Sequence, residues 1–139
     1  MAEPVMSGPV MSGPATPSPV HIRVSSDPAM SRVLRLAAGG VGSLAGFTVD
    51  EIEDIKVAVS EVLLALVEHG DGAIIDIELA VTDFGFEVHG RTPVQHFDAD
   101  HPDLLLCRTV LAGFCSRHGV EHWNGAAHIW ASVARTPSE

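Results

Sequence analysis

The feature of this sequence that most constrains its fold is an amphipathic helix pattern near the middle of the chain. Apolar residues recur there every three or four positions, so they fall on one face of a helix. Thr48 with Glu51, or Asp50 with Glu53, can form a capping box at its start, and Gly70 suits its end. Such a face needs a second layer to bury it. The face consists of Ile52, Ile55, Val59, Val62, Leu63, Leu66 and Val67.

Five strand-like segments can supply that second layer. They are rich in apolar residues, alternate in places with polar ones, and are bounded by turn residues. Asn124-Gly125 is the strongest short turn signal in the chain and predicts a hairpin. A second hairpin is expected about residues 82–85. The expected strands are 20–24, 73–81, 85–91, 120–123 and 127–134.

Two further helices complete the pattern. Asp27 can cap the first, and Pro28 suits its first position. The glycine-rich stretch 39–47 is expected to be a flexible link between two helices, since it lacks the Lys of a phosphate-binding loop. The last helix is expected at 103–117. The order predicts an α+β fold: a two-layer sandwich with a mixed, mostly antiparallel sheet and helices on one face.

Length and composition suit one soluble domain at 20–135, which leaves a low-complexity tail at 1–19, expected to be disordered, and a frayed end at 136–139. The formal net charge of -10 argues against nucleic-acid binding and favours a partner with a basic surface. Cys107 and Cys115 lack metal-site spacing. With no apolar run long enough for a membrane span and no secretory signal, we expect a cytoplasmic protein.

The long helix carries a family pattern. Asp54-Ile55-Lys56, Ala58-Val59, Ser60-Glu61 and His69-Gly70 stand in the register of the GHKL (histidine-kinase-like) ATPases. The chain most resembles their anti-sigma-factor serine kinase branch, the RsbW type, over roughly 20–135. This resemblance implies the GHKL fold, and it identifies Glu61 with the general base of the family.

The nucleotide motifs of that family are degenerate here. The family's Mg²⁺-binding Asn, four residues after the Glu, corresponds to Ala65, and a methyl group cannot bind a metal. The adenine-binding Asp corresponds to Gly90, or to His89 if the register slips by one, and a glycine of the same motif corresponds to Thr92. The glycine motif that opens the last helix is replaced by residues 98–107, which contain no glycine.

The resemblance therefore implies an anti-sigma-factor-like regulator, a pseudokinase of transcriptional stress responses. It would bind a sigma factor, an anti-anti-sigma (STAS) protein, or both, with ATP binding and kinase activity lost. Arg32 matches a family position on the partner surface, and a homodimer is implied. No cofactor and no metal are expected. The question of enzymatic activity stays open, with its loss favoured by the three missing motifs.

Two alternatives remain. A divergent serine kinase could phosphorylate an anti-anti-sigma factor, using ATP and Mg²⁺, Glu61 as base, and Glu68 or Asp71 as recruited metal ligands. A metal-binding regulator could use His118, His122 and His128, although no established metal motif contains them.

Overall fold

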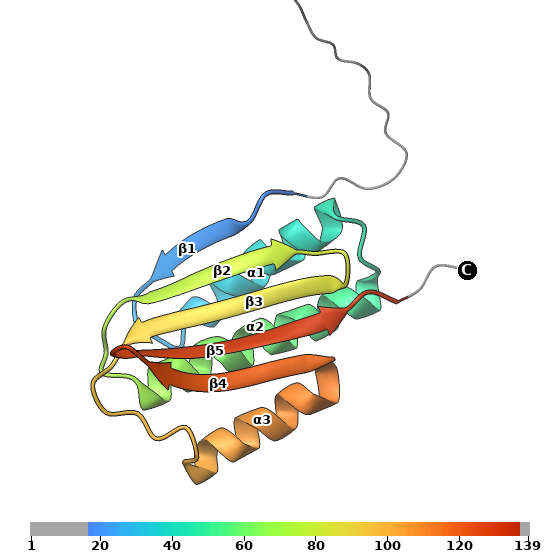
Figure 1. Cartoon of the computed structure of the whole chain (residues 1–139). Coiled ribbons are helices and arrows are strands. Elements are labelled where there is room, and N and C mark those ends of the chain that lie inside the picture. The colour runs from blue at the N-terminus through green and yellow to red at the C-terminus, as the bar shows by residue number, and fades with distance from the viewer. Residues whose placement is uncertain (1–16, 137–139) are drawn as a thin grey trace, which may run out of the picture.

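The computed structural model describes residues 17–136, so nearly all of the predicted tail at 1–19 and of the frayed end at 136–139 lies outside the described residues. Within that range the chain folds into one sheet and three helices (Figure 1). In chain order the elements are β1 (Val20–Val24), α1 (Met30–Leu44), α2 (Val49–His69), β2 (Ile75–Val81), β3 (Gly85–Pro93), α3 (Pro102–Phe114), β4 (Arg117–Trp123) and β5 (Ala126–Ala134).

The sheet has the order β1-β2-β3-β5-β4, and every neighbouring pair is antiparallel. Successive side chains along each strand alternate between its two faces. The apolar set faces the helices, and α1 and α2 lie behind the sheet while α3 lies beside the β4 edge (Figure 1). The opposite face carries polar side chains. The predicted α+β sandwich with helices on one face is confirmed.

The prediction of a flexible link at 39–47 was wrong for most of its length, because α1 continues to Leu44. A Cβ at Gly42 would lie 3.1 Å from Cγ1 of Ile52, and one at Gly39 would lie 3.1 Å from Cε of Lys56. The glycines therefore let α1 approach α2 closely. The helix begins at Met30 rather than at the predicted Pro28. Asp27 does not cap it; its carboxylate accepts a hydrogen bond from the backbone N–H of Ala29, in a turn that precedes the helix.

The long helix α2 matches its prediction closely. Thr48 accepts from the backbone N–H of Glu51 at 3.1 Å, and Glu51 accepts from that of Thr48 at 2.7 Å, which completes the capping box. Of the predicted apolar face, Ile52 and Val67 are half-buried and the other members are buried. None of the helices in the described range is long and apolar enough to cross a membrane.

The last helix and hairpin show one difference from expectation. Asn124 and Gly125 have φ of 56° and 78°, as the predicted two-residue turn requires. However, α3 ends at Phe114 rather than at 117. Both the N–H and the hydroxyl of Ser116 donate to the carbonyl oxygen of Ser132, at 2.8 and 3.0 Å. These bonds draw the chain into β4.

Candidate functional site

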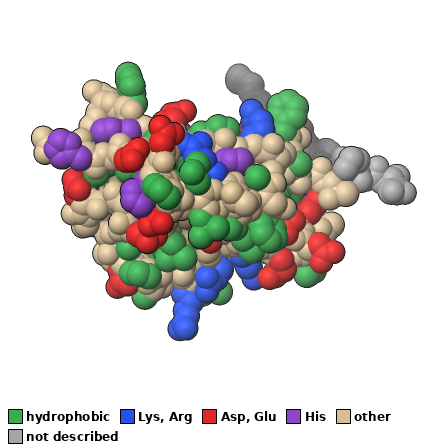
Figure 2. Space-filling model, turned by 90° about the horizontal axis from the view of Figure 1, so that it is seen from below, with side chains coloured by type: hydrophobic (Ala, Val, Ile, Leu, Met, Phe, Trp, Pro, Cys, Tyr) green, Lys and Arg blue, Asp and Glu red, His purple; other side chains and the backbone are tan. Residues whose placement is uncertain are grey.

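A hollow of about 350 Å³ lies between α2 and α3, and two of the predicted site residues, Glu61 and Ala65, line it. Figure 2 looks at the molecule from below, the side of α3, and shows most of the visible histidines gathered toward one end, with acidic side chains among them. The spacing of four residues places both predicted positions on one helix face. The lining is Glu61, Leu64, Ala65, Glu68, His69, Asp103, Leu106 and Cys107.

The electrostatics of this hollow oppose anions. Its lining contains the carboxylates of Glu61, Glu68 and Asp103 and no Lys or Arg. Burial raises the pKa of Glu61. Burial and then the nearby charge of Glu61 raise the pKa of the Cys107 thiol to about 11, so the thiol is protonated near neutral pH. A triphosphate would meet like charges here and no cationic side chain.

The adenine-motif positions on β3 point to different faces of the sheet. Gly90 faces the helices, where an added Cβ would lie 2.6 Å from Cδ1 of Leu66 and 2.8 Å from Cγ1 of Val62. His89, its neighbour, points to the open face and lies away from the hollow. Of these two positions only Gly90 therefore faces the helices, and apolar side chains fill the space beside it.

Thr92, the third degenerate position on β3, is buried and has a structural contact. Its hydroxyl donates to the carbonyl oxygen of Ile74 at 3.1 Å and lies 3.4 Å from that of Ala73. Its hydroxyl hydrogen is therefore engaged by the segment that precedes β2. Of the four degenerate positions, only Ala65 lines the hollow.

The loop between β3 and α3 is held against the domain by polar contacts. Arg108 donates to the carbonyl oxygen of Ala99 at 3.1 Å, and a ring nitrogen of His122 lies 3.0 Å from that of Val94. Asp71 accepts from the N–H of Gln95 at 3.2 Å and does not line the hollow. Of the two recruited metal ligands that the kinase alternative requires, only Glu68 therefore faces this hollow.

Arg32, the predicted partner-contact residue, is exposed on α1. It lines a shallow hollow of about 440 Å³ with Pro28 and Ser31. Its neighbour Arg35 donates to Ser60 at 3.0 Å and so links α1 to α2. Among the described residues no carboxylate pairs with Arg32.

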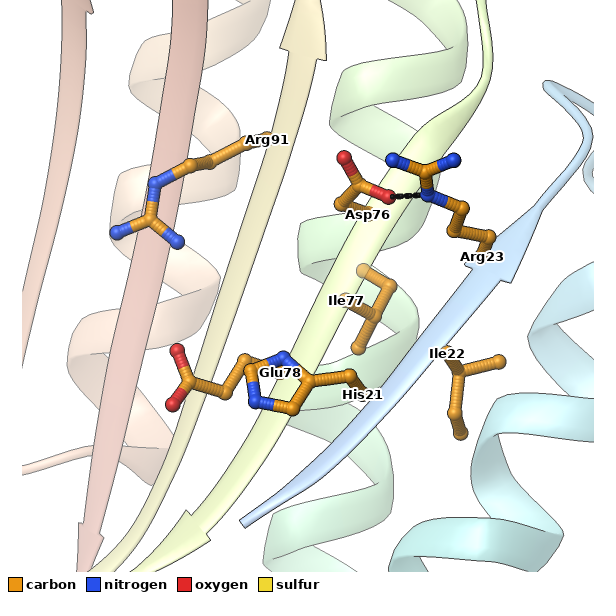
Figure 3. A pocket seen from close by; sticks show the side chains of 7 residues that line it. All are labelled: His21, Ile22, Arg23, Asp76, Ile77, Glu78 and Arg91. Carbon is orange, nitrogen blue, oxygen red and sulfur yellow. Dashed lines mark hydrogen bonds and ion pairs between the residues drawn. The ribbon is translucent and has the colours of Figure 1, made fainter.

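The open face of the sheet carries a polar surface that sequence reasoning missed. A hollow of about 520 Å³ lies there, and Arg23 pairs with Asp76 at 2.8 Å within its lining. Figure 3 shows this pair, with the side chains of Glu78 and Arg91 on the neighbouring part of the same face. Alternation in the strands is the signal that could have located this face, because its residues lie at every second position.

A chain of polar contacts continues across that face. His89 and His128 share a hydrogen bond at 3.0 Å, and a carboxylate flanks each ring: Glu87 at 3.1 Å from His89, and Glu121 at 3.5 Å from His128. Burial, then the positive charges of Arg91 and His89, lower the pKa of His128. Adding a proton to His128 is therefore less favourable than adding one to an unperturbed imidazole.

The histidines of the metal-binding alternative do not converge. His118 and His122 pair with Ala131 and Ala127, whose side chains are buried under the helices. His128 instead pairs with Glu121 on the open face. The pleat of the sheet therefore places His128 on the opposite side from the other two.

Known serine-protein kinases named RsbW resemble the chain in sequence. That of Bacillus subtilis (strain 168) is 42% identical over 85 residues, which cover 58% of this chain and 53% of the kinase. That of Bacillus thuringiensis (strain Al Hakam) is 32% identical over 116 residues, which cover 66% of this chain and 72% of the kinase. The chain spans about half the length of several of these relatives. No family model matches it.

Among solved structures, the RsbU and RsbW domains of a Mycobacterium tuberculosis protein match with a TM-score of 0.65. The match has 19% identity and covers 88% of this chain and 34% of that one. At this identity the likeness shows the fold alone, and it confirms the predicted GHKL-type sandwich. The family follows from the sequence match to the B. thuringiensis kinase, which is 32% identical and covers 72% of that kinase. The chain belongs to the RsbW family of anti-sigma-factor serine-protein kinases.

Proposed function

We propose that this protein is a regulator that binds a sigma factor, an anti-anti-sigma (STAS) protein, or both, and that it has lost ATP binding and kinase activity. Family membership supports the kind of partner, and the partners of bacterial transcription imply a cytoplasmic location. The loss of nucleotide chemistry rests on the hollow between α2 and α3.

The composition of that hollow is the observation that carries the proposal. Phosphoryl transfer needs cations around the phosphates and oxygen ligands for Mg²⁺. The lining instead contains three carboxylates and no Lys or Arg. By resemblance, the methyl group of Ala65 stands where the family has its metal-binding Asn. The carboxylates repel phosphates, and a methyl group cannot bind the metal that would compensate.

The space beside Gly90 supports the same proposal. A carboxylate at this position would need room for at least a Cβ, yet Leu66 and Val62 already lie within 2.8 Å of where that atom would stand. Nucleotide binding there would require repacking of the core, which is costly in a close-packed interior.

The kinase alternative has one observation in its favour. Glu61 lines the hollow, and burial raises its pKa toward the range of a general base. General-base catalysis still requires a bound phosphate donor. Nucleotide binding therefore separates the two functions.

Calorimetry with the full chain tests the proposal. We expect no heat from Mg-ATP at concentrations where a STAS protein or sigma factor from the same genome binds. Ala65→Asn should not restore nucleotide binding, because Leu66 and Val62 still fill the adenine position. Micromolar binding of Mg-ATP by the wild type would overturn the proposal. Transfer of phosphate to a STAS serine, abolished in Glu61→Gln, would establish the kinase alternative instead.

A further inference from the structure

We propose that His69, His101 and Asp103 form a binding site for a divalent transition metal, with Zn²⁺ as the best fit. The candidate ligand atoms of these three side chains all lie within 4.8 Å of one another. In the part of the chain that the structure describes, this is the only such group of three. It was not predicted from the sequence, and two of its members, His69 and Asp103, also line the hollow between α2 and α3.

Three different structural positions bring the ligands together. His69 is the last residue of α2, His101 is the N-cap of α3, and Asp103 lies in the first turn of α3. The two imidazole rings have centroids 5.0 Å apart and planes inclined by 58°. A metal here would therefore link the end of α2 to the start of α3 across the hollow.

The ligand chemistry selects the class of metal. Two imidazoles and one carboxylate suit Zn²⁺ and related transition metals, whereas Mg²⁺ and Ca²⁺ prefer oxygen ligands. With three protein ligands, a fourth position stays open for water. Glu68 is not a member of the group; its carboxylate lies 3.9 Å from Nε2 of His69 and adds negative charge beside that ligand.

Metal binding is coupled to the start of α3. Asp103 donates its backbone N–H to Nδ1 of His101 at 3.1 Å, which caps the helix. A neutral imidazole has one lone pair and one N–H, so a metal on either ring nitrogen leaves Nδ1 unable to accept this bond. Binding therefore frees the Asp103 amide, and the resonance of that amide reports the event.

The test is titration of the purified, chelator-treated full chain with Zn²⁺, and with Co²⁺ as a coloured substitute. We expect one metal per chain, a visible Co²⁺ spectrum of four-coordinate character, and a shifted amide resonance of Asp103. Zn²⁺ should also raise the melting temperature, since a ligand that binds only the folded state stabilises it. His69→Gln and Asp103→Asn should each weaken binding at least tenfold.

Matched control variants come from the loop between β3 and α3, which leads into His101. His96 and Asp100 are exposed and lie outside the group, so His96→Gln and Asp100→Asn should leave binding unchanged. Circular dichroism of each variant without metal checks that it is folded. The proposal is overturned if the wild type binds neither metal, or if folded His69→Gln and Asp103→Asn bind as tightly as the wild type. Equal weakening by His96→Gln would place the metal elsewhere and would also overturn it.

Discussion

At the scale of single residues, Gly90 lies where β3 crosses α2 and leaves no room for a side chain. Adding a Cβ brings it within 2.8 Å of Leu66 and Val62, so Gly90→Ala should destabilise the fold by about 1–3 kcal/mol through overpacking. Gly40→Ala is the matched control, because a Cβ there meets nothing within 4 Å. That change in a helix interior should stabilise by about 0.5–1 kcal/mol. Urea denaturation measures both.

If Gly90→Ala is as stable as the wild type, the close packing at β3 is not rigid and the nucleotide site could open.

The residue scale also shows which positions can be identified from the sequence. Ala65 could be identified from the resemblance to the family motif, and its spacing of four residues from Glu61 places the two on one helix face. The neighbours of His69 could not be identified, since His101 and Asp103 reach it only through the packing of α3 against α2.

At the scale of elements, the start of α2 depends on one carboxylate. Burial alone would raise the pKa of Glu51, but hydrogen bonds from the backbone N–H groups of Thr48 and Thr136 outweigh it and lower this pKa to about 2. In the unfolded chain the ordinary value is 4.5. The stabilisation is therefore present in full above pH 4.5 and is lost as the pH falls toward about 2.

Glu51→Gln removes this pH dependence. We expect the variant to be less stable at neutral pH, and its free energy of unfolding to fall less steeply than that of the wild type between pH 4.5 and about 2. Denaturant titrations at several pH values measure the two slopes. Thr48→Ser, which keeps the capping hydroxyl, should retain the wild-type slope. Equal slopes for Glu51→Gln and the wild type would contradict the assigned role of this carboxylate.

Element types were easier to predict than their ends. Strand β1 follows from the alternation of apolar and polar residues. The capping box of α2 follows from the local spacing of Thr48 and Glu51, whose side chains bond each other's backbone N–H. The glycines of α1 were misread, because a glycine that breaks a helix and one that admits a neighbouring helix look alike in sequence. Only the position of Ile52 against Gly42 separates the two.

At the scale of the whole molecule, the two layers divide the surface into distinct regions. Arg32 on α1 lies in the helical layer, whereas Arg91 lies on the open sheet face among charged side chains. The order of elements was sufficient to predict this architecture. The order alone does not locate the polar surface of the open face, which follows from the alternation within each strand together with the register of the five strands.

The net charge of -10 predicts how a partner associates. An acidic protein attracts a basic partner through long-range forces, which salt screens over a Debye length of about 8 Å at physiological ionic strength. We therefore expect the association rate with a sigma factor to fall several-fold as salt rises, while the dissociation rate changes little. Stopped-flow fluorescence at several salt concentrations measures both rates.

Arg32 should affect the dissociation rate, whereas the net charge affects the association rate, because a residue at the contact surface stabilises the complex after it has formed. Arg32→Ala should raise the dissociation rate and leave the salt dependence of association almost unchanged. Arg91→Ala removes the same charge from the opposite face, so it should leave dissociation unaltered. An association rate that does not respond to salt would exclude steering by the acidic surface. Equal effects of the two Arg variants on dissociation would show that α1 is not the contact surface.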